Sequence, residues 1–285
     1  MYSSVSQPVT SILRTRHFSA HLGYLFGELP LSNRVAAAAE AGFAAVEHPH
    51  PYSISADEMA RELSHAGLSF TQIALPAGDT LKGEKGLAIL PNRLAEFSDS
   101  INRGLDYAEA IGCRMVHVMA GLKPSGIAPR VLWSTYISNL QLAAEAAARR
   151  GITILIEPIG AGTLSGYYVD HPAIAARAIT DAGLSNIRLL LDIFHCVNSG
   201  LDPVAAIRHY GGLLAHVHIA DHPGRHEPGT GHIEFPSVYR ALDQVGYAGV
   251  VGCEYIPITE TRSGLGWIAA TREANSSLFP SPGDK

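Results

Sequence analysis

The sequence predicts an α/β fold, namely a single-domain (β/α)8 TIM barrel. Short apolar or β-branched runs alternate with Ala-rich amphipathic stretches, a pattern typical of parallel strands covered by helices. Eight such pairs occur within 285 residues, slightly more than the usual length of one such barrel. An open doubly wound sheet would alternate in the same way, but the chain lacks the Gly-rich phosphate turn expected after its first strand.

The expected strands share short apolar or β-branched sequences: His17 to Leu22, Ala44 to His48, Ser69 to Leu75, Met115 to Ala120, Thr153 to Glu157, Arg188 to Asp192, Leu213 to Ala220 and Val250 to Glu254. The expected helices share an amphipathic spacing: Leu31 to Ala41, Ala56 to Ala66, Arg93 to Ile111, Pro129 to Arg150, Pro172 to Ala182, Pro203 to His209, Pro236 to Val245 and Gly264 to Glu273. Several begin at proline and end near glycine, as the first-turn and C-cap preferences of those residues require. We expect the barrel to span residues 17–274, between an N-terminal extension at 1–16 and a flexible tail at 275–285.

The composition excludes several classes of partner. Charged residues make up 16% of the chain, the formal net charge is -5 and no dense basic run occurs, so nucleic acid is not an expected partner. No segment approaches the roughly 20 apolar residues of a membrane helix, so no membrane is expected either. The cysteines Cys113, Cys196 and Cys253 lack CxxC spacing, which favours a reducing, cytoplasmic location. A transit peptide at the N-terminus is the alternative.

Four consecutive strands carry a metal-binding type of side chain near their C-terminal ends. These residues are Glu157, Asp192, His218 and Glu254. The C-terminal ends of barrel strands form the active-site mouth, so we expect the four side chains to converge there. Two Glu, one Asp and one His suit Mg²⁺ or Mn²⁺, with Co²⁺ or Zn²⁺ as alternatives. Helix capping or an ion pair would explain any one of them, but neither requires this register on four strands.

Other polar residues are candidates for substrate binding. Arg225 lies in a long polar loop, Asp221 to Gly231, and is expected to clamp a carboxylate or hydroxyl group of the substrate. His195 is either a substrate contact or a structural partner of the metal site. Glu47 and Lys123 each follow or end a strand and are further candidates.

At these residues the sequence resembles the hydroxypyruvate isomerase family, part of the wider xylose isomerase-like group of barrels. The resemblance runs from about His17 to Trp267. The matching segments are LeuPheGlyGluLeuPro at Leu25 to Pro30, AlaGlyPheAlaAlaValGlu at Ala41 to Glu47, LeuProAlaGlyAsp at Leu75 to Asp79, AspIlePheHis at Asp192 to His195, the loop Asp221 to Gly231, and ValGlyCysGluTyr at Val251 to Tyr255.

The resemblance implies an aldose–ketose type isomerase that acts on a small hydroxy-oxo acid or sugar through an enediol. General chemistry agrees, because a metal that chelates adjacent carbonyl and hydroxyl oxygens stabilises the enediolate while a carboxylate moves the proton. We expect Glu157 and Glu254 to be the acid/base pair as well as metal ligands. A homo-oligomer is left open.

Two departures from the family pattern bear on the substrate. Hydroxypyruvate isomerases usually carry Gln at the position of His218, whereas ketose epimerases usually carry His there. After Glu157 the family continues with an Asn and an Arg-Asp pair, but this chain has Gly160, Gly162 and Thr163. The leading hypothesis is an isomerase of a hydroxypyruvate-like or 2-oxotetronate-like acid. A ketose 3-epimerase is the alternative, and a metal-dependent endonuclease on the same barrel is a more distant one.

Overall fold

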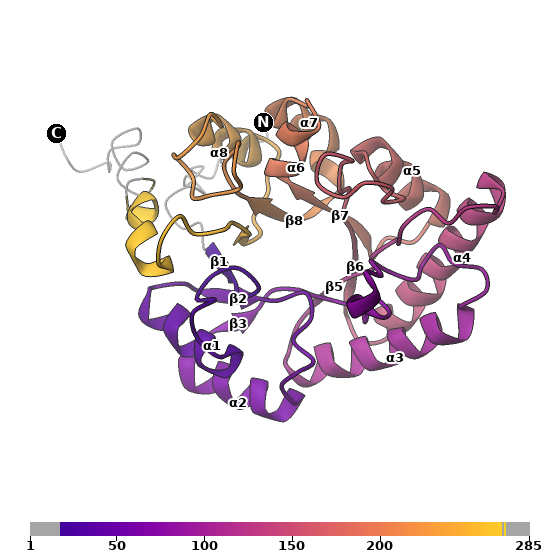
Figure 1. Cartoon of the computed structure of the whole chain (residues 1–285), viewed down its shortest axis with the longest axis horizontal. Helices are drawn as coiled ribbons and strands as arrows, with labels where there is room; N and C mark the ends of the chain where they lie inside the picture. The colour runs from indigo at the N-terminus through magenta and orange to yellow at the C-terminus, as the bar shows by residue number, and fades with distance from the viewer. Residues whose placement is uncertain (1–17, 270, 272–285) are drawn as a thin grey trace, which may run out of the picture.

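The computed structural model describes residues 18–269 and residue 271 (Figure 1). It has one parallel sheet of nine strand segments in the order β3-β2-β1-β9-β8-β7-β6-β5-β4, with helices packed outside it. This architecture confirms the predicted TIM barrel. The predicted extension at 1–16, the first residue of the predicted first strand and the predicted tail at 275–285 lie outside the described residues.

The strands are β1 (Phe18–His21), β2 (Ala45–Glu47), β3 (Ser69–Phe70), β4 (Ile73–Ala74), β5 (Met115–His117), β6 (Thr153–Ile156), β7 (Ile187–Asp192), β8 (Leu214–Ile219) and β9 (Val251–Cys253). The α-helices are α1 (Leu31–Glu40), α2 (Ala56–Ala66), α3 (Leu94–Ala110), α4 (Pro129–Ala148), α5 (Pro172–Ala182), α6 (Ile193–Asn198), α7 (Pro203–Tyr210) and α8 (Phe235–Gln244). Short 3₁₀ turns lie at Thr80–Lys82, Gly211–Leu213 and Thr261–Gly264.

The predicted strand from Ser69 to Leu75 is divided into β3 and β4, and this division explains how the barrel closes. β3 pairs with β2, whereas β4 pairs with β5. Only Thr71 and Gln72 separate the two segments, so the chain itself joins the two ends of the sheet. The Thr71 N–H donates to the Val46 carbonyl at 2.8 Å, which continues the pairing across the gap. The nine segments therefore form the eight-stranded ring expected of this fold.

Several helices begin at the predicted prolines or end at the predicted glycines. Ser55 caps α2 by accepting a hydrogen bond from the Glu58 N–H, and Gly67 ends that helix at a φ of 68°. Pro129, Pro172 and Pro203 each begin a helix, as predicted. No helix among residues 18–269 is long and apolar enough to cross a membrane.

Two helices differ from the prediction. The additional helix α6 begins directly after Asp192, whose Oδ1 accepts hydrogen bonds from the N–H groups of Phe194 and His195 at 2.7 and 3.3 Å. A carboxylate at this position caps the helix, so the chain turns into α6 immediately at the mouth of the barrel. The last predicted helix, Gly264 to Glu273, is helical at residues 266–269 and 271. Gly264 instead ends a 3₁₀ turn, and residues 270, 272 and 273 lie outside the described residues.

Candidate active site

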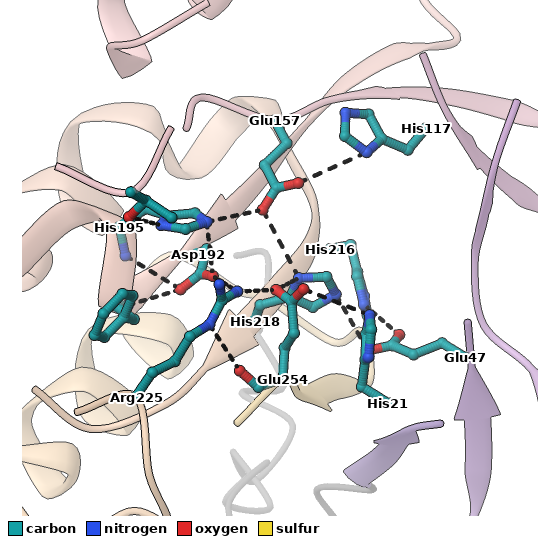
Figure 2. A network of polar contacts seen from close by, with 12 residues as sticks. His21, Glu47, His117, Glu157, Asp192, His195, His216, His218, Arg225 and Glu254 are labelled. Carbon is teal, nitrogen blue, oxygen red and sulfur yellow. Dashed lines mark hydrogen bonds and ion pairs between the residues drawn. The ribbon is translucent and has the colours of Figure 1, made fainter. Parts of the chain in front are cut away.

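Four polar side chains meet at the C-terminal mouth of the barrel, where active sites of this fold lie (Figure 2). They are the predicted metal ligands: Glu157 directly after β6, Asp192 at the end of β7, His218 in β8 and Glu254 directly after β9. One ligand atom from each lies within 4.8 Å of the others. Register explains this, because Asp192 pairs with His218 and His218 pairs with Gly252, so neighbouring strands end at the same level.

His218 lies at the centre of this cluster. Its Nδ1 atom is 2.9 Å from Glu254 Oε2 and 3.9 Å from Glu157 Oε1. These three atoms are buried, and apart from the close ion-pair contacts none makes a well-aligned hydrogen bond within the described part of the chain. Buried polar atoms almost always have a partner, so three of them around one point fit a bound cation.

The two glutamates of the cluster have opposite pKa shifts. Burial, together with the nearby charge of Glu254, raises the pKa of Glu157 well above its usual value. Burial also opposes the ionisation of Glu254, but Arg225 and His218 outweigh it and hold the pKa of Glu254 well below its usual value. Carboxylates whose pKa values are pushed apart are typical of acid and base partners in an active site.

Arg225 reaches the cluster from the loop after β8. Its Nη2 atom lies 3.2 Å from Asp192 Oδ2 and 2.8 Å from Glu254 Oε2. The guanidinium also stacks on the rings of Tyr24 and Phe194, 5.1 and 5.3 Å from their centroids. Two carboxylates of the protein therefore already balance the charge of the residue that we predicted to clamp the substrate.

The loop that carries Arg225 is held in shape by one buried carboxylate. Asp221 accepts backbone hydrogen bonds from four N–H groups within residues 222–233. Arg225 has a φ of 60°, a left-handed conformation uncommon outside glycine, and its N–H donates to the Asp221 carbonyl at 3.0 Å. The loop is thus a fixed support that directs Arg225 at the cluster.

Glu47, a predicted substrate contact, lies at the end of β2 and is fully buried. It contacts the edge of the His218 ring that faces away from Glu254. Its carboxylate is 3.1 Å from His218 Nε2 and 2.8 Å from His216 Nε2. Gly252 on β9 permits this packing, because a Cβ atom there would lie 2.1 Å from Glu47 Oε1. The carboxylate fixes the ring of His218 with Nδ1 toward the cluster, as the partners of metal-binding histidines usually do.

The stretch after Glu157 that departs from the family pattern packs against the end of α6. A Cβ atom on Gly160 would lie 1.9 Å from Ser199 Oγ, and one on Gly162 would lie 3.0 Å from Asn198 Nδ2. The space left by the two glycines is therefore filled by α6 and the residue after it. A prediction from strand ends alone could not find this packing, because α6 itself was not predicted.

The two remaining predicted substrate contacts lie in different surroundings. His195 is buried, with Nε2 3.8 Å from Glu157 Oε1 and Nδ1 3.1 Å from the hydroxyl of Thr163. Lys123 forms an ion pair with Asp170 at 2.9 Å, and its side chain is 46% exposed. The structure thus places His195 at the cluster and Lys123 in a surface pair.

Two buried histidines that sequence analysis did not single out also contact the cluster (Figure 2). His21, the last residue of β1, has Nε2 3.5 Å from Glu254 Oε1. His117, the last residue of β5, has Nδ1 3.6 Å from Glu157 Oε2. Burial lowers the pKa of both, to about 3 for His117, so both are neutral hydrogen-bonding groups at neutral pH. Their position at strand ends is the signal that could have found them.

The class of protein is a parallel α/β barrel with a buried carboxylate–histidine cluster at its mouth, and comparison with known proteins gives the family. A family model described as a xylose isomerase-like TIM barrel matches residues 35–271. The chain therefore belongs to the xylose isomerase-like TIM barrel family, as the resemblance predicted.

Curated relatives and a solved structure narrow this further. The chain is 38% identical over 251 residues to a 2-oxo-tetronate isomerase of Cupriavidus necator, covering 88% of this chain and 96% of the relative. It is 35% identical over 251 residues to the hydroxypyruvate isomerase of Escherichia coli, covering 88% and 97%. A crystal structure described as an AP endonuclease, family 2, from Brucella melitensis superposes with a TM-score of 0.87 at 38% identity, covering 90% of this chain and 98% of that chain. The chain is an isomerase enzyme.

Proposed function

We propose that this isomerase interconverts a small hydroxy-oxo acid, of the hydroxypyruvate or 2-oxotetronate kind, through an enediol and with one divalent cation. The observation that carries the proposal is the buried cluster of Glu157, Asp192, His218 and Glu254 at the barrel mouth. The names of the relatives support the substrate class, since the two quoted isomerases act on 2-oxo-tetronate and hydroxypyruvate.

The donor set of the cluster fits a divalent cation. Its three carboxylates and one imidazole are the mostly oxygen-based ligands that Mg²⁺ and Mn²⁺ prefer, and Co²⁺ or Zn²⁺ are the alternatives. Glu157 Oε1, His218 Nδ1 and Glu254 Oε2 make no well-aligned hydrogen bond among the described residues and lie close together. When bound there, the cation supplies a positive charge that stabilises negative charge developing on the neighbouring oxygens of the substrate.

The two glutamates are placed to move protons. Strands β7 and β8 separate β6 from β9, so Glu157 and Glu254 face a bound substrate from different sides. One glutamate removes the proton from the carbon that bears the hydroxyl group, the C–H electron pair becomes the enediol double bond, and the carbonyl oxygen takes up a proton. A proton then returns to the former carbonyl carbon while the other hydroxyl loses its proton, so atoms and charge balance.

The neighbouring histidines support this exchange. His21 and His117 lie next to the outer oxygens of Glu254 and Glu157 and hold the two carboxylates in place. His195 lies between Asp192 and Glu157, within reach of a substrate hydroxyl. These contacts from separate strands keep the reacting groups in fixed positions, which is the main requirement of proton transfer.

A substrate panel tests the proposal. Protein stripped of metal with a chelator and then reloaded with Mg²⁺ or Mn²⁺ should convert hydroxypyruvate or 2-oxotetronate, and the stripped protein should not. Ketopentoses and ketohexoses belong in the same panel, because His218 is the feature that favours a ketose 3-epimerase. Turnover of ketoses with none of the acids would replace the proposed substrate class.

A nuclease is the second candidate, because the Brucella structure is described as an AP endonuclease. The net charge of -5 speaks against it, since DNA binding requires a basic surface. Cleavage of a duplex containing an abasic site, with affinity that falls steeply as salt increases, would favour the nuclease. The absence of cleavage in protein that isomerises the acids would exclude it.

We also propose a cytoplasmic location. The cysteines Cys113, Cys196 and Cys253 are free and buried, which fits a reducing compartment. Fractionation of cells that express the full chain would test this directly.

A further inference from the structure

A cavity lies at the C-terminal end of the barrel, beside the ends of β2, β4 and β5. Its volume is about 380 Å³, and its lining includes His50, Tyr52, Glu84, Lys85, Arg103 and Met119. His50 lies three residues beyond the end of β2, and Met119 lies two residues beyond the end of β5. The cavity is therefore on the side of the mouth from which His117 contacts the cluster.

Two cations of this cavity have no polar partner within residues 18–269. Among the described residues, neither Lys85 nor Arg103 makes a side-chain hydrogen bond or an ion pair. Other cations near the mouth are engaged, since Arg225 pairs with two carboxylates of the cluster and Lys123 pairs with Asp170. Lys85 is the half-buried member of the free pair, whereas Arg103 is exposed.

The acids of the Lys85 loop are already used elsewhere. Glu84, next in sequence, forms an ion pair with Arg93 and accepts a hydrogen bond from the Asp79 N–H at 2.6 Å. The carboxylate of Asp79 pairs with Lys82 at 2.9 Å. The positive charge of Lys85 therefore remains available inside the cavity.

The backbone beside Lys85 is fixed against β5. Gly86 forms a bridge with Ala120, and its N–H donates to the Ala77 carbonyl at 3.0 Å. Only glycine allows this approach, because Gly86 has a φ of 117° and a Cβ atom there would lie 2.2 Å from the Met119 carbonyl oxygen. A loop tied down in this way presents its side chain in a limited region, which favours specific binding.

Electrostatic coupling links this lysine to the cluster. The charge of Lys85 helps burial to lower the pKa of His50, and His50 in turn contributes to the lowered pKa of His117. His117 contacts Glu157 directly. Lys85 and His50 line the cavity, and His117, whose pKa His50 affects, contacts Glu157 in the cluster.

We propose that Lys85 binds the carboxylate of the hydroxy-oxo acid, so that the acid end of the substrate lies in this cavity while its hydroxy-oxo end lies at the cluster. This inference rests on the proposed function and names the residue that selects acids over neutral sugars. An ammonium group in a partly buried site binds a carboxylate through charge-assisted hydrogen bonds, and a neutral ketose offers no such group.

Calorimetric titration of glycerate tests the inference, because glycerate has the carboxylate and hydroxyls but no carbonyl to isomerise. With Mg²⁺ present, Lys85→Gln should weaken glycerate binding by about 10- to 100-fold, the range expected for a hydrogen bond to a charged group. Lys85→Arg should restore most of the affinity. Lys82→Gln, on the same loop but 80% exposed and paired with Asp79, is the matched control and should bind as the wild type does.

The kinetic outcomes separate this inference from the proposed function. Lys85→Gln should raise the KM for hydroxypyruvate about 10-fold or more while kcat changes by only a few-fold. Glycerate binding or a KM for hydroxypyruvate that Lys85→Gln leaves unchanged would overturn the carboxylate site, whereas turnover of the acids would still support the proposed function. Lys85-dependent glycerate binding in a protein that isomerises no acid would support the carboxylate site and overturn the proposed function.

Discussion

The two halves of the barrel mouth carry different chemistry. Strands β6 to β9 supply the carboxylates of Glu157, Asp192 and Glu254, which surround one point together with His218. The half formed by β1 to β5 supplies buried histidines whose pKa values are lowered, His21 and His117 among them, and the cavity beside Lys85. We propose that the first half, called the anionic half below, holds a cation and that the second, called the histidine-rich half, holds the carboxylate of the substrate. The difference favours a substrate with a chelating group at one end and a negative charge at the other.

The largest expected effect is the loss of either glutamate from the anionic half. Glu157→Gln and Glu254→Gln should each lower kcat by about 10²- to 10⁴-fold, because proton transfer by a positioned carboxylate contributes that much. Steady-state kinetics with saturating metal measures this. Glu145→Gln, exposed on α4, is the matched control. Either glutamine variant turning over at the wild-type rate would remove its glutamate from the proposed mechanism.

Glu47 sharpens the comparison, because it is a carboxylate of the histidine-rich half that acts on the anionic half. Glu47→Gln should weaken binding of Mn²⁺ by about 10- to 100-fold, since the carboxylate that orients His218 is lost. Its kcat at saturating metal should stay within a few-fold of the wild type. Titration of Mn²⁺ followed by electron paramagnetic resonance gives the affinity without any turnover. An unchanged Mn²⁺ affinity in a folded variant would contradict the orienting role.

The smallest expected effect is on stability at low pH and concerns His48 in the histidine-rich half. Burial, with His21 and His50 nearby, lowers the pKa of His48 from 6.5 to about 3. The unfolded chain takes up this proton below pH 6.5 and the folded chain does not, so stability is intact above pH 6.5 and is lost as the pH falls toward 3. The loss is about 1 kcal/mol for each pH unit at most.

Denaturant unfolding between pH 7.5 and pH 4.5 checks this expectation. His48→Gln should show a shallower decrease in the free energy of unfolding than the wild type, and His65→Gln, exposed on α2, is the matched control. Identical pH profiles for wild type and His48→Gln would show that folding does not lower the pKa of His48.

Much of the anionic half could be predicted from the sequence. Parallel strands are apolar, so a carboxylate at the end of one is conspicuous, and Glu157, Asp192 and Glu254 stood out for that reason. Register then brings such residues together without any knowledge of packing, because neighbouring strands of a barrel end at the same level. The structure brings the four predicted residues close together, and their role as metal ligands stays a prediction.

The histidine-rich half was harder to predict for a physical reason. The strands predicted at His17 to Leu22 and Met115 to Ala120 place His21 and His117 inside a strand, where a histidine is usually a core residue. The observed strands end at His21 and His117. A shift of one to three residues in a strand boundary therefore decides whether a residue is assigned to the hydrophobic core or to the active site. Boundaries are the least certain part of a sequence-based prediction.

Contacts made by loops or across the barrel could not be predicted from the sequence. Nothing in the local sequence shows that Arg225 faces Asp192 and Glu254, or that Glu47 passes over Gly252 to reach His218. These contacts depend on how loops and distant strands pack, which a periodic pattern does not encode.

The most direct test of the central claim is solvent deuterium incorporation followed by proton nuclear magnetic resonance. Protein loaded with Mg²⁺ or Mn²⁺ and incubated with hydroxypyruvate in D₂O should replace the hydrogen on the hydroxyl-bearing carbon with deuterium, and metal-stripped protein should not. Glu254→Gln should suppress the exchange. An absence of exchange into hydroxypyruvate and 2-oxotetronate by metal-loaded, folded protein would contradict the proposed enediol chemistry.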